Sequence, residues 1–222
     1  MLWILASLFF FWCGFREVRR SIVPAPGFDV PTPISKSYLA IVLSSAVILA
    51  WPPAHTWYFE GFLARRATEL ADNHPAKVHC NTLFDTMLDP EMLAAGHANP
   101  KTGKIVIQKP WCGTLMSYLR HPGRASDEEL ESLDMITHES MHVRGELNEA
   151  ITECEAVQRN YRAAKLLGVP DDVAKRNALD YYNTIYQQRG KIGGLQGAYY
   201  SEQCAPGKSM DERLSDSTWA TP

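Results

Sequence analysis

Two stretches without charged side chains open the chain. Residues 1–15 contain none, and residues 38–59 hold a dense apolar run that Pro52-Pro53 is expected to end. Neither stretch has the polar face of an amphipathic helix from a soluble domain. We therefore expect two N-terminal membrane helices, at 1–15 and 38–59, although the first would span only about 22 Å of a hydrocarbon core about 30 Å thick.

A cleaved leader is the main alternative for this apolar region. Lys36 precedes the second run, as in a signal peptide, whereas the first stretch lacks a positively charged start and a small-residue cleavage site. The intervening loop holds four cations, Arg16, Arg19, Arg20 and Lys36. The positive-inside rule places that loop in the cytoplasm, so the chain after residue 59 would lie on the other side. A leader sends the domain to the same side. We expect a cell-membrane protein with an extracytoplasmic C-terminal domain.

Polar segments with helical periodicity fill residues 60–222, which we interpret as one extracytoplasmic domain. Its strongest helix signal is a capping box, Ser126 to Glu129, followed by apolar residues at helical spacing and a stop at Gly145. The β-branched run 104–108 and the turn residues before it predict a hairpin. The expected elements are helices over 60–73, 111–120, 127–144, 147–167 and 171–188, a hairpin over 93–108 and a loop-like tail over 192–222. The expected fold class is α+β and mostly helical.

The sign of the net charge also changes after residue 59. The 222 residues carry a formal net charge of −3, but residues 1–59 are net +2 and the remaining 163 residues are net −5. An acidic domain lacks the basic footprint of a nucleic-acid-binding protein, so we expect no nucleic-acid partner. The apolar quarter, 1–59, is interpreted as a membrane anchor.

Four of the five cysteines lie in the polar domain, at Cys80, Cys112, Cys154 and Cys204. No two of them form a CxxC pair, which argues against a structural zinc knuckle. An even number of cysteines in an exported domain predicts two disulfides, with three possible pairings. Reduced core cysteines are the alternative.

A His-Glu-x-x-His motif lies within the capped helix. His138 and His142 are four residues apart, so one helix face presents both imidazoles one turn apart, where they can bind a single ion. Zinc suits histidine ligands and a catalytic site with three protein ligands and a water. Glu139 would lie beside the ion as the general base on the zinc-bound water. The alternative is a solvated helix face with two unrelated histidines.

The segment after this helix resembles the NExxx(D/E) segment of gluzincin metallopeptidases. It reads Asn148-Glu149-Ala150-Ile151-Thr152-Glu153. The resemblance implies that Glu149 is the third zinc ligand and that Glu153 supports a ligand histidine. It departs in spacing, because gluzincins place this segment further downstream, whereas six residues separate His142 from Glu149 here. A tight turn at Gly145 would make the two helices antiparallel and bring both glutamates near the histidines, so Glu153 stays open as the ligand.

Other residues compete for the remaining roles. The stretch from His138 to Asn148 also resembles the metzincin pattern HExxHxxGxx(H/D), although Asn148 is a poor zinc ligand and no Met-turn is evident. His97, in the hairpin, is an outside candidate for the third ligand, and an exposed histidine is the simpler interpretation. Many zincins add a second donor to the oxyanion. Tyr199 or Tyr200 is available for that role, and packed tyrosines are the simpler interpretation.

The sequence thus predicts a zincin-type, gluzincin-like zinc metallopeptidase, similar to small membrane-anchored bacterial proteins with an HExxH domain. The expected cofactor is one catalytic Zn²⁺ held by His138, His142 and Glu149, and the expected partners are a peptide or protein substrate and the membrane. In zincins an edge strand beside the active-site helix binds substrate, and the run 104–108 is the candidate here. The alternative functions are a non-catalytic zinc-bearing domain and a metal-free interaction domain, both membrane-anchored.

Overall fold

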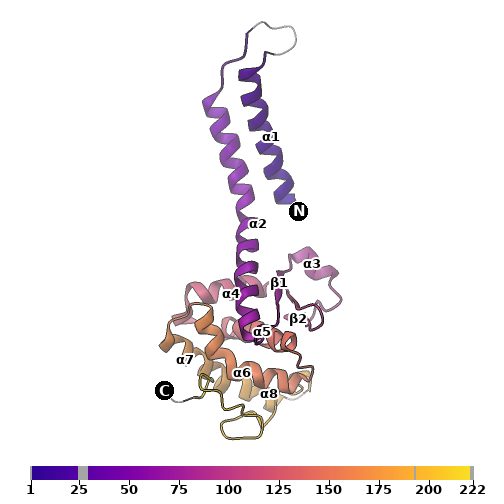
Figure 1. Ribbon diagram of the computed structural model, residues 1–222, viewed down its shortest axis with the longest axis vertical. Helices are drawn as coiled ribbons and strands as arrows, with labels where there is room; N and C mark the ends of the chain where they lie inside the picture. The colour runs from indigo at the N-terminus through magenta and orange to yellow at the C-terminus, as the bar shows by residue number, and fades with distance from the viewer. Residues whose placement is uncertain (1, 25–29, 193, 221–222) are drawn as a thin grey trace. The chain divides into compact units, whose positions relative to one another are not determined.

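The computed structural model describes residues 2–24, 30–192 and 194–220 of the chain (Figure 1). The chain divides into two compact units, Met1–Phe59 and Glu60–Pro222. The first unit is helical, and the second holds a small sheet and most of the helices (Figure 1).

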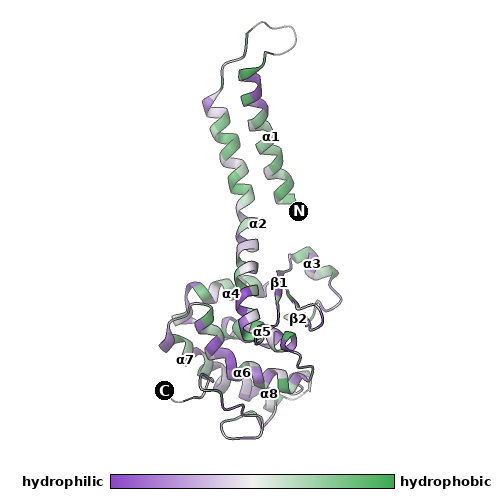
Figure 2. Ribbon diagram, viewed as in Figure 1, coloured by the Kyte–Doolittle hydropathy of each residue, from purple (hydrophilic) through white to green (hydrophobic). Residues whose placement is uncertain are grey.

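Both N-terminal stretches are helical, as α1 (Leu2–Ile22) and α2 (Lys36–Leu70). Among the helices of the described residues, only α2 is long and apolar enough to cross a membrane. The prediction of two membrane helices is therefore wrong for α1. Its uncharged part ends at Phe15, before Arg16 and Glu17, and is too short to cross a bilayer. Figure 2 shows the apolar colouring of α1 and of the first part of α2, and the polar end of α1.

The proline pair does not end the second helix. α2 continues through Pro52 and Pro53, where the sequence predicted a stop. Each proline removes one backbone hydrogen bond and its ring crowds the carbonyl four residues earlier, whereas the neighbouring turns keep their hydrogen bonds. The hydroxyl of Thr56 adds a hydrogen bond to the carbonyl oxygen of Pro52, at 3.1 Å. Membrane helices tolerate prolines for reasons of this kind.

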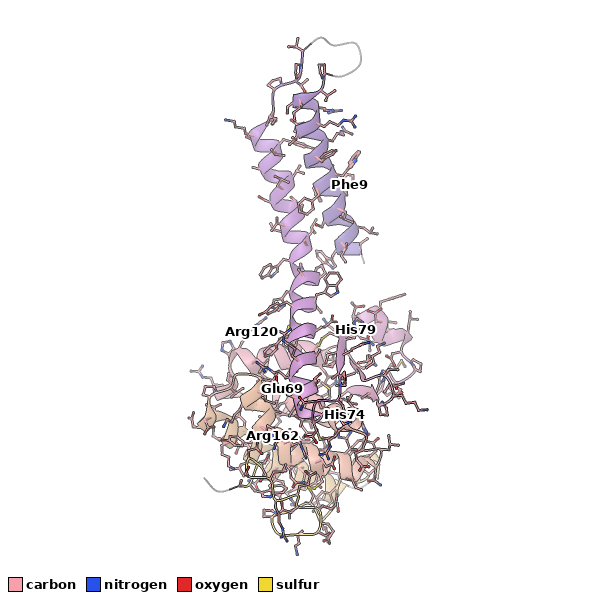
Figure 3. All side chains as sticks on the ribbon, in the orientation of Figure 1. Phe9, Glu69, His74, His79, Arg120 and Arg162 are labelled. Atoms are coloured by element: carbon pink, nitrogen blue, oxygen red, sulfur yellow. A yellow bond between two sulfur atoms is a disulfide. The ribbon has the colours of Figure 1, made fainter. Side chains whose placement is uncertain are left out.

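Small residues bring α1 and the first part of α2 together within the first unit. Ser7 is buried, and its hydroxyl donates to the carbonyl oxygen of Ala46 over 2.9 Å. Gly14 is also buried, and a Cβ there would lie only 3.2 Å from Leu43. Small residues at these positions allow the two helix backbones to approach closely. Large side chains project outward instead, as Phe9 does in Figure 3.

The described part of the second unit includes a mixed sheet in the order β1-β3-β2. β1 (Lys77–Cys80) pairs with β3 (Lys104–Ile107) in parallel, and β2 (Gly96–Asn99) pairs with β3 in antiparallel orientation. The predicted hairpin is confirmed as β2 and β3. The choice of 104–108 as the edge strand is wrong, because β1 occupies the other side of β3. The four residues of β1 were too few to give a periodic signal, and β1 and β2 are the two edge strands.

The other regular elements in the described part of the second unit are helices. They are α3 (Leu83–Leu88), α4 (Trp111–Arg120), α5 (Asp127–Arg144), α6 (Glu149–Leu166), α7 (Asp171–Asp180), α8 (Gln187–Ile192) and α9 (Gly194–Gly197), with a 3-10 turn η1 (Pro122–Arg124) and a π-helix η2 (Tyr181–Tyr186). α4 and α5 have the predicted bounds. The helix predicted over 171–188 is α7, which continues through η2 into α8.

Helix α5 lies at the centre of the second unit. Every residue from Ser132 to Met141 is buried, and α5 packs against α4, α6, β2, β3 and η2. Its capping box forms as predicted, because the Ser126 side chain accepts from the Glu129 amide and Glu129 accepts from the Ser126 amide. The helix ends at Gly145, whose φ of 119° favours glycine.

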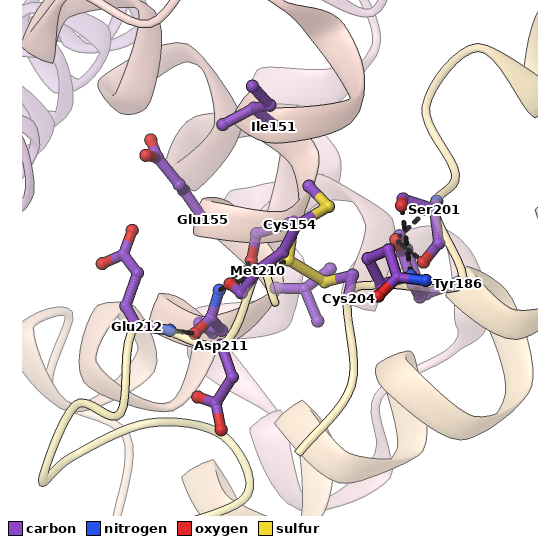
Figure 4. Close-up of a disulfide and its surroundings, with 12 residues drawn as sticks. Ile151, Cys154, Glu155, Tyr186, Ser201, Cys204, Met210, Asp211 and Glu212 are labelled. Carbon is purple, nitrogen blue, oxygen red and sulfur yellow. Dashed lines mark hydrogen bonds between the residues drawn. A yellow bond between two sulfur atoms is a disulfide. The ribbon is translucent and has the colours of Figure 1, made fainter. Parts of the chain in front are cut away.

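Two disulfides form in the second unit, as the cysteine count predicted. Cys80–Cys112 joins β1 to α4, and Cys154–Cys204 joins α6 to the C-terminal tail. Figure 4 shows the second bond beside Met210, Asp211 and Glu212 of the tail. Ion pairs from α6 hold the same tail, as Arg159 pairs with Glu212 and Arg162 with Asp216. Disulfides of this kind are typical of exported domains.

Candidate metal centre

Two helices supply the candidate site. His138 and His142 lie one turn apart on α5, on the side that α6 covers. Four residues connect the helices, and Asn148 caps α6 by accepting a hydrogen bond from the Ile151 amide at 3.1 Å. The two helices run antiparallel, because Glu149 at the start of α6 reaches His142 near the end of α5, whereas Asn160 further along α6 reaches Asp134. The tight turn that the sequence predicted therefore brings the start of α6 to the histidines.

Three side chains converge at this point. Nε2 of His138 lies 3.1 Å from Nε2 of His142 and 3.1 Å from Oε2 of Glu149. The distance from Nε2 of His142 to the same carboxylate oxygen is 3.5 Å. A zinc ion bonded tetrahedrally at its usual distances holds its ligand atoms about 3.3 Å apart. The three residues form a group that could hold a metal ion.

The outer ring nitrogens of both histidines already have partners. Nδ1 of His138 lies 2.9 Å from Oε2 of Glu153, and Nδ1 of His142 lies 2.8 Å from the carbonyl oxygen of Glu146. Both partners accept only, so each Nδ1 carries its hydrogen, and a ring in its neutral form directs the lone pair of Nε2 toward the group. Two lone pairs and a carboxylate facing one another at about 3 Å repel unless a cation lies between them. The donor set therefore fits a divalent metal.

The charges of the site agree with this. Burial would lower the pKa of His138, but the carboxylates of Glu149 and Glu153 outweigh it and raise that pKa. His142 behaves in the same way, because Glu149 and the Glu146 carbonyl outweigh burial and raise its pKa. Hydrogen bonds from the two rings lower the pKa of Glu149 to about 2. The site attracts a positive charge, whether a proton or a metal ion.

Glu139 lies beside this group and is buried. Burial raises the pKa of its carboxyl, and the two histidines only partly oppose that effect. Its Oε2 has no hydrogen-bond partner among the described residues. A buried carboxylate oxygen without a partner is costly, which points to a ligand or water that it would meet in the occupied site.

A cavity of about 610 Å³ opens onto these side chains. It is lined by residues of β2 and the segment before it, by Met135, His138, Glu139 and His142 of α5, by Glu149 and Glu153 of α6, and by Arg189 and Tyr199. A carboxylate, two imidazoles and an edge strand therefore face one space.

Gly96 sets the distance between β2 and α5, the helix that carries both histidines. A Cβ at this position would lie 2.9 Å from Sδ of Met135, 3.0 Å from the Val106 carbonyl oxygen and 3.5 Å from Cγ of Glu139. Only a glycine therefore allows β2 to approach α5 this closely. The sequence alone does not indicate a role for Gly96, because the close approach is visible only in three dimensions.

A buried polar network supports Glu153. The hydroxyl of Tyr181, on the π-helix, lies 2.5 Å from Oδ2 of Asp134 and 2.9 Å from Oε1 of Glu153. Arg189 pairs with the same Oε1, and Asn160 donates to Oδ1 of Asp134 at 2.7 Å. One hydroxyl hydrogen cannot serve two carboxylates, so a second proton is needed. Burial, and then the charge of Glu153, raises the pKa of Asp134 to about 8, so that Asp134 is the acid that holds it.

Sequence reasoning missed Asp134, Tyr181 and Arg189. Asp134 precedes His138 by one helical turn, which could have drawn attention to it. No spacing connects Tyr181 or Arg189 to the motif, because the irregular helix η2 carries Tyr181 to Glu153. π-Helical turns are frequent at functional sites.

The remaining candidates lie at different distances from the group. His97 lines the cavity but pairs with Asp89 at 3.1 Å. Asn148 is occupied as the helix cap, and Glu153 binds the far side of the His138 ring. Tyr199 lines the cavity with its ring 5.7 Å from that of His138, whereas Tyr200 packs against Tyr186.

Comparison with known proteins identifies no family, since no family model, curated protein or solved structure matches the chain. The resemblance to gluzincins therefore depends on the motif residues alone.

Proposed function

We propose that the protein is a membrane-anchored zinc metallopeptidase that hydrolyses peptide bonds. The observation that carries the proposal is the convergence of both Nε2 atoms and Oε2 of Glu149, with both Nδ1 atoms held by acceptors. Two neutral imidazoles and one carboxylate form a donor set typical of catalytic zinc sites.

The residues around the group fit hydrolysis better than a purely structural metal site. A zinc ion bound there would act as a Lewis acid and lower the pKa of a coordinated water. Glu139 would take a proton from that water and deliver it to the leaving amine. A structural site has no need of the unpartnered, buried carboxylate that Glu139 supplies.

The edge strand β2 supports a peptide as the substrate. It lies at the end of the strand order and lines the cavity beside Glu139. An extended peptide would add to such an edge through backbone hydrogen bonds. Tyr199 and Arg189 line the same space and offer donors to the oxygen of the scissile carbonyl. β2 takes the role that the sequence analysis gave to residues 104–108.

The rest of the chain supports a location at the membrane. α2 supplies one candidate membrane helix, and two disulfides favour an oxidising compartment for the second unit. We therefore place the cavity on the extracytoplasmic side, with α2 as the anchor.

The full chain, purified in detergent under oxidising conditions, tests the proposal. We expect about one zinc per chain by mass spectrometry, and zinc-dependent cleavage of fluorescein-labelled casein. Glu139→Gln should keep the zinc and abolish cleavage, whereas His142→Ala should lose both. Glu128→Gln, an exposed acid on the first turn of the same helix, is the matched control.

The outcomes separate the alternatives. A folded protein that binds no zinc would contradict the metal site itself. Zinc binding with no cleavage of any polypeptide, or cleavage that survives Glu139→Gln, would favour a non-catalytic metal-bearing domain.

A further inference from the structure

Six large apolar side chains are exposed on one short segment before the edge strand. They are Leu83, Phe84, Met87, Leu88, Met92 and Leu93, with exposed fractions between 51% and 95%. We call this set the apolar ledge. Single exposed apolar residues are ordinary, but a concentration of six within eleven residues marks an interaction surface.

The ledge has a fixed shape. Its first four members lie on one face of α3, because they occupy positions i, i+1, i+4 and i+5. The Thr82–Asp85 capping box begins this helix, and the hydroxyl of Thr86 accepts a hydrogen bond from the Lys109 amide at 3.0 Å. The Cys80–Cys112 disulfide holds the chain just before the helix. The exposed side chains therefore stand on an ordered base.

The ledge is also acidic. Asp85, Asp89 and Glu91 lie among its apolar residues, and residues 82–100 contain no lysine or arginine. The hydrogen bond from Thr82 lowers the pKa of Asp85. Burial would raise the pKa of Asp89, but hydrogen bonds from the Glu91 backbone and His97 bring it down to about 2. Both acids are negatively charged at neutral pH, but only Asp85 and Glu91 are exposed, because the Asp89 carboxylate lies against Asn81 and His97.

The ledge leads into the cavity of the metal centre. Glu91 and Leu93 line that cavity, and the chain continues from them into β2. The lining of the cavity also includes another exposed apolar residue, Leu147, and two more acids, Glu131 and Glu149. The ledge and the cavity lining thus both combine apolar side chains with carboxylates, and the arginine in the lining, Arg189, is paired with Glu153.

We propose that the apolar ledge is a docking site for a polypeptide segment that carries apolar and basic side chains, and that it guides this segment into the cavity. The part that concerns cleavage rests on the proposed function, whereas docking itself does not. The negative charge of the ledge favours a basic polypeptide over a lipid surface. A surface that binds anionic lipid is enriched in lysine and arginine, and the ledge has neither.

Docking is measured on the full-length Glu139→Gln variant in discs of zwitterionic phosphatidylcholine, so that no peptide is cleaved. The probes are three labelled peptides of equal length, one with a leucine centre flanked by lysines, one with serine in place of leucine, and one with glutamate in place of lysine. Fluorescence anisotropy, corrected with empty discs, gives each dissociation constant. We expect only the leucine–lysine peptide to bind well.

Variants then locate the binding. The double variant Phe84→Ser, Leu88→Ser should bind the leucine–lysine peptide about tenfold more weakly or worse, because two large apolar contacts are lost. Ile192→Ser, which removes an exposed isoleucine of α8, is the matched control and should leave binding unchanged. Equal binding by the ledge variant and the control would overturn the proposal.

Two further measurements exclude other occupants. A fluorophore attached at Phe84→Cys, in a Cys13→Ser background, should report an aqueous environment in the disc before peptide is added. A bilayer-like emission would assign the ledge to lipid and overturn the proposal, as would self-association of the chain that the ledge variant abolishes. If the peptide does not dock but Glu139-dependent cleavage of casein persists, the docking proposal alone is refuted. If the peptide docks but the protein binds no zinc, the proposed function alone is refuted.

Discussion

Oε2 of Glu153 accepts a hydrogen bond from Nδ1 of His138 at 2.9 Å, and both side chains are buried. This contact determines which nitrogen of His138 faces the cavity. Glu153 is in turn held by Tyr181 and Arg189, so the orientation of a candidate metal ligand depends on residues far along the chain.

Removing this support should weaken metal binding without removing a ligand. Glu153→Ala leaves Nδ1 of His138 and the Arg189 guanidinium without their acceptor, and we expect zinc affinity to fall by about 10- to 100-fold. Glu153→Gln keeps an oxygen that can accept from Nδ1, so zinc affinity should fall less in this variant. Competition with a chromogenic chelator measures both. Equal losses in the two variants would show that the hydrogen bond to His138 is not what matters.

The local parts of the site could be predicted from the sequence, because each depends on residues close together in the chain. The capping box fixes where α5 begins, Gly145 fixes where it ends, and the four-residue turn brings Glu149 to His138. The spacing of two histidines within one helix needs no tertiary information.

The parts that were missed depend on long-range packing. Residues 104–108 have the composition of a strand, but whether a strand is central or at the edge depends on its neighbours. β1 supplied that neighbour without a periodic signal. The prolines of α2 were expected to end a helix, which is true only where the lost hydrogen bonds are not tolerated. Arg189 reaches Glu153 through an irregular helix that no pattern predicts.

Gly96→Ala should disturb the packing of β2 against α5 and so distort the site. The new Cβ would meet Sδ of Met135 at 2.9 Å and the Val106 carbonyl oxygen at 3.0 Å, so β2 must move away from α5. We expect a loss of stability of about 1–3 kcal/mol and reduced cleavage of casein with zinc still bound. Gly113→Ala is the control. Its Cβ meets nothing within 4 Å on α4, and alanine should stabilise that helix by about 0.5–1 kcal/mol. Chemical denaturation compares the two, and equal stability of both variants would contradict close packing at Gly96.

Asp134→Asn should make stability less dependent on pH. Burial raises the pKa of Asp134 to about 8 in the folded state, above its ordinary value of 3.8. Between these values the folded protein holds a proton that the unfolded chain has lost, so this group destabilises the fold progressively as pH rises from about 4 to about 8. Asparagine is neutral throughout and can still donate to Tyr181. Its melting temperature should therefore fall less than that of the parent between pH 5 and pH 8. An equal fall would mean that Asp134 is ionised in the folded protein.

Zinc affinity should fall as the pH is lowered. This fall should begin at a higher pH than the ordinary histidine pKa of 6.5 would give. Zinc needs both Nε2 atoms free of protons, whereas the carboxylates of Glu149 and Glu153 raise the pKa of His138 in the metal-free protein above the ordinary 6.5. Protons therefore compete with zinc already above pH 6.5, and affinity should fall by about tenfold per pH unit for each proton displaced. Glu149→Gln should bind zinc more weakly at pH 8, because a ligand is lost, yet begin to lose affinity only at a lower pH, because the histidines lose the negative charge beside them. Titration of the zinc affinity from pH 5 to pH 8.5 measures both effects. A parent protein whose affinity stays constant down to pH 6 would show that the carboxylates do not hold protons on these histidines.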